Sequence, residues 1–209
     1  MADNSSKCAW CMGSEMMQEY HDAEWGFPKH DDTQHFEFLI LEAAQAGLSW
    51  STILKRRGGY KKAFAHFDPA KVSKFDGKTI EKLMKDKGII RNRLKITAVI
   101  NNAKPFIAIQ KEFGSFDKYI WGFSDGKQIV NNIRATKDIQ AKTALSDIIS
   151  ADLKKRGFSF VGSTIIYSHL QAVGVVNDHE NLCFRKDICK RILKIILPDI
   201  KRLPSCCFL

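Results

Sequence analysis

Residues 79–110 read TIEKLMKDKGIIRNRLKITAVINNAKPFIAIQ, and this stretch decides the fold. The pattern predicts a short helix over residues 79–86, a tight turn over residues 87–90 and a longer helix over residues 91–110. Gly88 sits in the turn, where a residue without a side chain lets the backbone reverse sharply. The stretch is a candidate helix-hairpin-helix unit, but a plain helical turn is the commoner meaning of a helix-Gly-helix pattern.

Three basic residues, Arg91, Arg93 and Lys95, follow the turn. Amide groups at the start of a helix point away from it, with the positive end of the helix dipole behind them, so they favour a phosphate. Basic side chains next to them add charge of the same sign. On the hairpin interpretation, Gly88 and these three residues form a phosphate-binding site.

Most of the remaining chain also has the periodicity of helices. Apolar residues recur at helical spacing almost throughout, and strand-like alternation is scarce. Asp31 or Asp32 can cap a helix that runs to about Ala46, and Gly157 and Gly174 sit where other helices should stop. We therefore expect an all-α fold, built as a single compact helical domain.

The composition indicates a polyanionic partner. The chain has 209 residues, and its 33 Lys and Arg against 23 Asp and Glu give a formal charge of +10. Basic side chains that neutralise phosphates release counterions, which drives binding to nucleic acid whatever its sequence. Charge alone is weak support, because many basic intracellular proteins touch no nucleic acid.

The sequences at the two ends of the chain indicate where the helical domain stops and where in the cell the protein is expected. We assign residues 1–189 to the helical domain and residues 190–209 to a basic and apolar C-terminal extension of unknown role. The first seven residues form a short polar segment rather than a secretory leader, and no apolar run approaches a membrane span, so we expect the protein to stay inside the cell. We take a monomer as the default. The final Cys206-Cys207-Phe208-Leu209 formally fits a prenylation box, but we do not predict membrane attachment.

Histidine and cysteine residues near both ends are candidate metal ligands. His179 and Cys183, at i and i+4 on an expected helix, would project from one face and reach one tetrahedral ion. Near the start, Cys8 could pair with His21, or with Cys11 in a C-x-x-C pair, and the residues alone do not decide between them. Such a His and Cys spacing is also common in protein cores.

Glu42 is the candidate carboxylate of a binding site. Its neighbours one helical turn away include Phe38, Leu39 and Ala46, so it should face an apolar region. A buried carboxylate is costly unless it is paired, protonated or waiting for a cationic or hydrogen-bond-donating ligand. A structural ion pair is the alternative.

Several longer strings are distributed from about residue 8 to residue 183. They are Cys8-Ala9-Trp10, Tyr20-His21-Asp22, Glu24-Trp25-Gly26, Leu41-Glu42, Gln45-Ala46-Gly47-Leu48-Ser49-Trp50, Gly88-Ile89-Ile90-Arg91, Lys154-Lys155-Arg156-Gly157-Phe158, Phe160-Val161-Gly162 and Val176-Asn177-Asp178-His179. In order and spacing these strings resemble the 3-methyladenine DNA glycosylase I family.

The resemblance implies an enzyme of the helix-hairpin-helix superfamily of DNA glycosylases. Such an enzyme flips 3-methyladenine out of alkylated double-stranded DNA and hydrolyses its bond to deoxyribose, leaving an abasic site. The resemblance also implies one structural zinc ion that joins the N- and C-terminal regions. Its ligands would be Cys8, His21, His179 and Cys183.

The resemblance assigns roles within the site as well. Glu42 becomes the catalytic, base-recognising residue, because a carboxylate selects a methylated purine that carries positive charge over neutral adenine. Tyr20, Trp10 and Trp50 would line the base pocket, while Trp25 is expected in the core. Facing DNA would be Gln45, Gly47, Leu48 as a wedge, Gly88, Arg91, Arg93 and Lys95. Leu94 departs from the family, which commonly has a small residue there.

Two other functions stay open at this stage. A zinc-dependent hydrolase would use three metal ligands and a metal-bound water, with Glu42 as the base. A non-catalytic helical DNA-binding module would need the basic hairpin but no pocket, which leaves Glu42 and the aromatic residues unexplained.

Overall fold

The structure of the protein is a computed structural model that describes residues 6–186. The expected domain boundary after residue 189 and the prenylation-like end lie outside the described residues. So do Cys189, Cys206 and Cys207.

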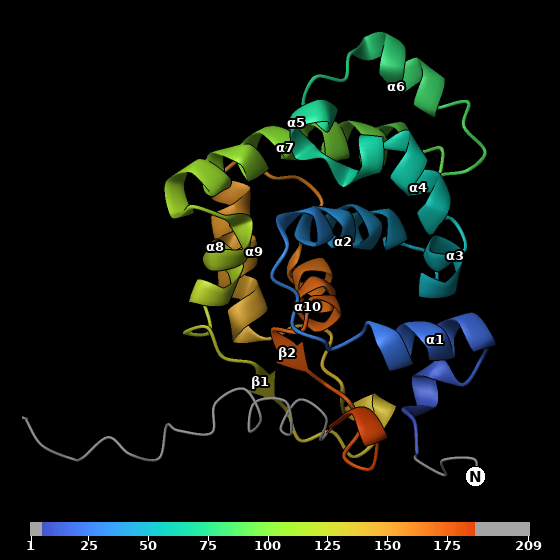
Figure 1. Ribbon diagram of the computed structural model, residues 1–209, viewed down its shortest axis with the longest axis vertical. Helices are drawn as coiled ribbons and strands as arrows, with labels where there is room; N and C mark the ends of the chain where they lie inside the picture. Colours follow the sequence, from blue (N-terminus) through green and yellow to red (C-terminus); the bar gives the residue numbers. More distant parts are fainter. Residues whose placement is uncertain (1–5, 187–209) are drawn as a thin grey trace, which may run out of the picture.

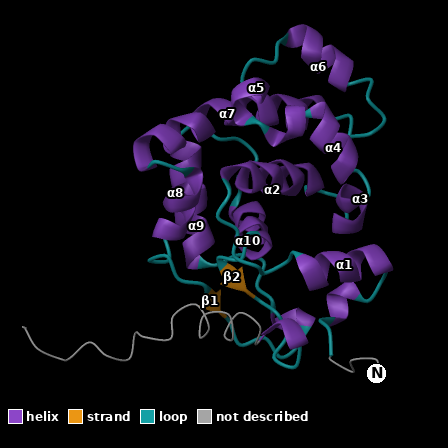
Figure 2. Ribbon diagram, viewed as in Figure 1, coloured by secondary structure: helices purple, strands orange, loops and turns teal. Residues whose placement is uncertain are grey.

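The described chain is mostly helical, as expected (Figures 1 and 2). The α-helices are α1 (Glu15–Ala23), α2 (Asp32–Gln45), α3 (Trp50–Leu54), α4 (Arg57–Ala63), α5 (Pro69–Val72), α6 (Gly77–Leu83), α7 (Arg93–Phe113), α8 (Phe116–Gly122), α9 (Ala144–Lys155) and α10 (Ser163–Ala172). Three short 3-10 helices accompany them, η1 (Ala9–Cys11), η2 (Ala65–Phe67) and η3 (Thr136–Asp138). The only strands among the described residues are two short parallel ones, β1 (Ile129–Val130) and β2 (Val176–Asn177).

Several predicted helix ends are confirmed. The Asp31 side chain accepts a hydrogen bond from the backbone amide of Gln34, which caps α2 as the sequence indicated. Gly157 and Gly174 follow α9 and α10 with φ of +94° and +75°, the left-handed conformation that ends a helix at little cost in glycine.

Helix α2 lies at the centre of the fold and contacts α3, α4, α7, α8 and α10 (Figure 1). Two of its four turns are buried almost all round, over residues 38–44. Aromatic rings join its first half to the neighbouring helices. The ring of Phe36 meets that of Phe106 edge-on, and Phe106 stacks on Phe116 with 4.2 Å between ring centroids. A central helix enclosed in this way can hold a polar side chain away from water.

The predicted short helix, turn and long helix are present in α6, the residues 84–92 and α7, with shifted ends. The first helix begins two residues before the expected 79–86 span and stops three residues short of its end. The early start has a cause in Asp76, which caps the helix at its N-terminus by accepting from the Thr79 amide. Asn92 caps α7 in the same way and accepts from the Lys95 amide at 3.1 Å.

The hairpin turn rests against α4. A Cβ atom added to Gly59 would collide with the carbonyl oxygen of Gly88, so the two backbones touch. Next to this contact, the Tyr60 hydroxyl accepts a hydrogen bond from the Ile90 amide at 3.2 Å. The hairpin is therefore positioned by α4 as well as by its own helices.

The two ends of the described chain lie side by side below α1 (Figure 1). Ser6 forms a parallel bridge with Cys183, and its carbonyl accepts from the Phe184 amide at 3.0 Å. No helix within residues 6–186 is long and apolar enough to cross a membrane.

We predict that Gly59→Ala destabilises the fold by about 1–3 kcal/mol, because its methyl group must displace the Gly88 backbone. Gly58→Ala is the matched control: it lies in the same helix and a Cβ there meets nothing within 4 Å. That change should be neutral or stabilise by up to about 1 kcal/mol. Urea unfolding of both variants decides the matter, and equal stabilities would show that the Gly59–Gly88 contact does not matter.

Candidate active site and metal centre

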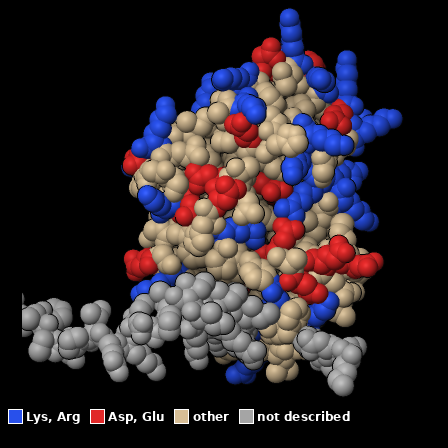
Figure 3. Space-filling model, viewed as in Figure 1, with Lys and Arg blue, Asp and Glu red and all other residues tan. Residues whose placement is uncertain are grey.

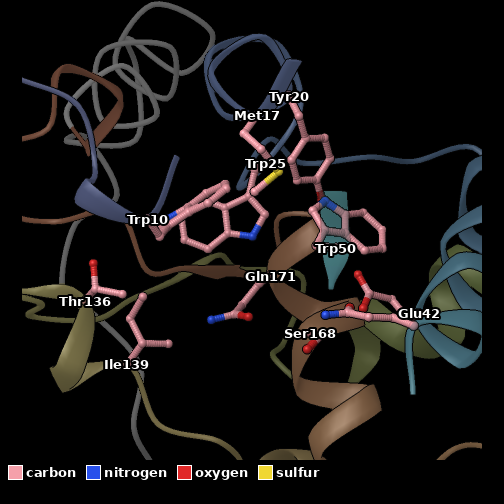
Figure 4. A pocket seen from close by; sticks show the side chains of 11 residues that line it. Trp10, Met17, Tyr20, Trp25, Glu42, Trp50, Thr136, Ile139, Ser168 and Gln171 are labelled. Carbon is pink, nitrogen blue, oxygen red and sulfur yellow. The ribbon is translucent and has the colours of Figure 1, made fainter. Parts of the chain in front are cut away.

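A cavity of about 360 Å³ opens between α1, α2 and α10 (Figure 4). The walls come from segments far apart in the sequence. They consist of Trp10, Met17, Tyr20, Trp25, Glu42, Gln45, Trp50, Thr136, Ile139, Ser168 and Gln171. The structure thus brings together all four residues expected to line a base pocket, namely Trp10, Tyr20, Glu42 and Trp50.

Glu42 enters this cavity from the enclosed part of α2 (Figure 4). It is only 5% exposed, and none of the described residues donates a hydrogen bond to its carboxylate or pairs with its charge. Burial alone raises the pKa of this carboxyl group to about 8. The alternative of a structural ion pair is therefore not what the described residues form.

Aromatic rings face Glu42 across the cavity (Figure 4). Tyr20 contacts Trp50 with 5.4 Å between ring centroids, and Trp10 contacts Trp25 with 4.9 Å. The indole N–H groups of Trp10 and Trp50 are buried and find no hydrogen-bond acceptor among residues 6–186. Trp25 is 7% exposed, as expected for the core, yet its ring also reaches the cavity wall.

Ser168 and Gln171, one turn apart on α10, are cavity residues that the sequence reading missed. Gln171 donates its amide nitrogen to the carboxylate of buried Asp178 at 2.7 Å, and Tyr167 and Asn131 donate to the same carboxylate. Because a carboxylate accepts only, the Gln171 amide must turn its nitrogen to Asp178. The sequence did contain a signal for them, because Ser168 and Gln171 are two polar residues at i and i+3, on one face of a largely apolar helix.

A second, smaller cavity of about 190 Å³ adjoins the first and shares Glu42, Gln45 and Ser168 with it. Gly47 and Leu48 line it, and Leu48 is 40% exposed. Gln45, Gly47 and Leu48, which the family resemblance assigned to DNA contact, thus line a cavity that adjoins the pocket.

The hairpin residues lie outside both cavities. Arg91 is exposed, and Arg93 forms an ion pair with Glu81 across the hairpin at 2.7 Å. The Lys95 ammonium group is turned towards the protein, where it donates hydrogen bonds to the carbonyl oxygens of Ala44 and Ala46. Lys and Arg side chains gather over the α4 and α6 region on the face in Figure 3.

Cys8, His21, His179 and Cys183 form a buried cluster that could hold a metal ion. Their donor atoms lie within 4.8 Å of one another. His21 Nε2 is 3.2 Å from His179 Nδ1 and 3.3 Å from Cys183 Sγ, and Cys8 Sγ is 3.5 Å from His179 Nδ1. Tetrahedral zinc with ~2.3 Å sulfur and ~2.0 Å nitrogen bonds places its ligands ~3.3–3.8 Å apart, so these three separations are close to those of a tetrahedral site.

The remaining polar atoms of the cluster are also satisfied, as is usual for metal ligands. His21 Nδ1 lies 2.7 Å from Asp22 Oδ1, and His179 Nε2 lies 3.0 Å from the carbonyl oxygen of Trp25. The Cys8 sulfur accepts from the Glu180 amide at 3.3 Å. These contacts leave His21 Nε2 and His179 Nδ1 directed at the cluster.

Two expectations about the metal ligands have clear outcomes. The prediction that His179 and Cys183 lie on a helix is wrong: they flank a turn after β2, tied down by bridges from Glu180 to Ile133 and from Cys183 to Ser6. Of the two cysteines in the C-x-x-C pair, Cys8 belongs to the cluster and Cys11 does not, since the Cys11 thiol donates to the Cys8 carbonyl oxygen instead.

Comparison with known proteins identifies the family of the chain. The profile of the methyladenine glycosylase family matches residues 10–186. The chain belongs to this family. It is 41% identical to the DNA-3-methyladenine glycosylase of Haemophilus influenzae over 86% of this chain and 97% of the relative. It is 43% identical to DNA-3-methyladenine glycosylase 1 of Escherichia coli over 83% and 92% of the two chains.

Solved structures of the family have the same fold. A crystal structure of a 3-methyladenine DNA glycosylase I superposes with a TM-score of 0.83 at 42% identity, covering 86% of this chain and 98% of the other. A Tyr-to-Phe variant of such an enzyme in complex with 3-methyladenine gives a TM-score of 0.84 at 34% identity, over 86% and 97% of the chains. The family resemblance drawn from the sequence is thus confirmed.

We predict that Glu42→Gln stabilises the protein increasingly as pH rises. Glu42 keeps its proton in the folded state up to a pKa of about 8 but loses it near 4.5 when unfolded, so stability falls between these values. The variant removes this loss. Its advantage should be near zero below pH 4.5 and reach a few kcal/mol above pH 8, since a tenfold change in proton affinity is worth about 1.4 kcal/mol.

Urea unfolding between pH 4 and pH 9 measures the difference, with the exposed Glu19→Gln on α1 as control. A Glu42→Gln variant that is less stable than the parent at high pH would mean that the carboxylate has a stabilising partner.

Proposed function

We propose that this protein is a DNA base-excision repair enzyme that removes 3-methyladenine from alkylated double-stranded DNA by hydrolysis of the N-glycosyl bond. The observation that carries the proposal is an unpaired, buried carboxylate, Glu42, facing aromatic rings in a cavity of about 360 Å³. Its relatives named as DNA-3-methyladenine glycosylases match over most of both chains.

The charge of the substrate explains how Glu42 selects it. Methylation at N3 leaves a positive charge on the base in the intact nucleotide, whereas normal adenine is neutral. Burial raises the pKa of Glu42 to about 8 in the free pocket, and a nearby cation lowers it again. A methylated base therefore meets a carboxylate, while the surrounding rings of Tyr20 and Trp50 stack well on a cationic base.

Because alkylation already makes the base a good leaving group, the pocket needs little acid catalysis. Glu42 then acts in catalysis by holding the positively charged base in place and favouring its departure from the sugar.

A base inside the duplex cannot reach this cavity, so the nucleotide must flip out. We assign Leu48 as the wedge that enters the base stack, because it is an exposed leucine at the mouth of the pocket, beside Gln45 and Gly47. We further propose that α6 and α7 act as a helix-hairpin-helix. The turn at Gly88, with Arg91 and Arg93, would then contact the DNA backbone.

We propose that the Cys8, His21, His179 and Cys183 cluster holds one structural zinc ion. Zinc bound there would cross-link the two ends of the chain. Four protein donors complete a tetrahedral sphere and leave no position for water, which argues against a zinc-dependent hydrolase. A DNA-binding module without catalysis would have no use for a buried Glu42 in an aromatic cavity.

We predict that Glu42→Gln lowers the rate of 3-methyladenine excision by about ten- to hundred-fold, the value of a hydrogen bond to a charged partner. Chromatography of the base released from alkylated DNA measures the rate, and Glu19→Gln controls for the loss of a negative charge elsewhere. Discrimination against neutral adenine should shrink in parallel. Normal excision by Glu42→Gln would place the reaction outside this pocket.

We also predict about one zinc ion per chain in the purified protein, and its loss in Cys183→Ala. Cys11→Ala is the matched control, since Cys11 is equally buried and close by but outside the cluster. It should keep the metal. Metal analysis by mass spectrometry tests both, and loss of zinc from Cys11→Ala but not from Cys183→Ala would overturn the assignment.

A further inference from the structure

Lys95 connects the hairpin to the helix that carries Glu42. Its ammonium group donates to the carbonyl oxygens of Ala44 and Ala46, at 2.9 and 2.6 Å. These contacts cross 51 and 49 residues of sequence, from the first turn of α7 to the end of α2. Desolvation in this position lowers the pKa of Lys95.

Within residues 6–186, no other basic side chain donates a hydrogen bond to the carbonyl groups at the end of α2. A helix ends with carbonyls that lack partners inside the helix, and with the negative end of its dipole. The last turn of α2 contains no basic residue, and Ala46 ends the helix with φ of −43° and ψ of 114° rather than in a left-handed cap. Only Gln45 among its last carbonyls is met locally, by the Leu48 amide at 2.6 Å.

Lys95 is also fixed at its own backbone. Its amide donates to the Asn92 side chain that caps α7, so the residue belongs to the rigid start of that helix. The two carbonyl groups that it holds lie two and four residues after Glu42, and the second of them, that of Ala46, immediately precedes Gly47 and Leu48. The Lys95 side chain therefore connects the start of α7, in the hairpin, to the end of α2, beside the pocket.

We propose that Lys95 is a positioning residue, which fixes the end of α2 so that Glu42 and Leu48 keep their places, rather than a phosphate contact of the hairpin. The proposal rests on the proposed function for its activity readouts. Two of the three ammonium N–H donors are directed at α2, whereas the neighbouring Arg91 is exposed and available to a phosphate.

The test compares Lys95→Met, which keeps the apolar stem, with Arg91→Met and with Lys104→Met, an exposed lysine further along α7. Three quantities are measured: the salt dependence of affinity for undamaged duplex, the single-turnover excision rate at saturating enzyme, and the affinity for free 3-methyladenine. A lost phosphate contact lowers the slope of log affinity against log salt by about one.

For Lys95→Met we expect the parental salt slope, with excision rate and free-base affinity each lowered about ten-fold, the value of a hydrogen bond from a charged donor. Arg91→Met should lower the salt slope by about one, and Lys104→Met should alter none of the three quantities. A salt slope lowered by about one in Lys95→Met, whatever its excision rate, would overturn the proposal.

Hydrogen exchange provides a readout that does not depend on activity. The amides of residues 46–50 should exchange faster in Lys95→Met and in the milder Lys95→Gln than in the parent or Lys104→Met. Unchanged exchange in this segment would also overturn the proposal. A parent protein that releases no 3-methyladenine would instead refute the proposed function, while the exchange experiment would still decide the role of Lys95.

Discussion

Glu42 is kept from water on a helix that gives it no partner, and the rest of the structure must hold that helix still. A buried carboxyl group would otherwise gain free energy by reaching solvent. Helix α2 is fixed at both ends by the α7 region. At its start, Asp32 accepts from the Gln110 side chain at 2.7 Å and from the Phe116 amide at 2.9 Å, and at its end Lys95 holds two carbonyls. The packing and hydrogen bonds around α2 thus offset the free energy that is lost by burying the unpaired Glu42 carboxyl group.

The cluster near the chain ends determines where the aromatic wall of the pocket lies. His21 directly follows Tyr20 in α1, and its ring lies 5.5 Å from that of Trp10. His179 is linked to the same wall, because its Nε2 atom contacts the Trp25 carbonyl oxygen. An ion bound to these histidines would therefore position three of the four pocket-facing aromatic residues without touching the base. Hydrogen bonds to the second ring nitrogen of a histidine usually orient that histidine towards a metal ion. In this protein such contacts also connect the cluster to the wall of the pocket.

Local signals in the sequence were sufficient for the helical fold class and for several helix ends, but not for contacts between distant segments. The Asp31 cap of α2 and the glycines after α9 and α10 are read from a few neighbouring residues, so they could be predicted. The i, i+4 spacing of His179 and Cys183 suggested a helix, but a turn held by bridges to Ile133 and Ser6 brings the same two residues together. Nothing in the sequence near Lys95 indicates that its charge meets carbonyls some 50 residues away.

Two opposing effects decide how well the pocket distinguishes a charged base from a neutral one. With a pKa of about 8, Glu42 must release a proton to meet a cation at pH 7, which costs roughly 1.4 kcal/mol. A hydrogen bond to an ionised group contributes about 1.5–3 kcal/mol, against about 1 kcal/mol between neutral groups, and a second ionised partner adds to this in a dry site. The stronger hydrogen bond therefore roughly offsets the cost of ionisation, and the attraction between the carboxylate and the positively charged base supplies the net gain. Neutral adenine would meet the protonated carboxyl group without any cost of ionisation but also without a charge to attract, so selection for the methylated base depends on the attraction between the two charges.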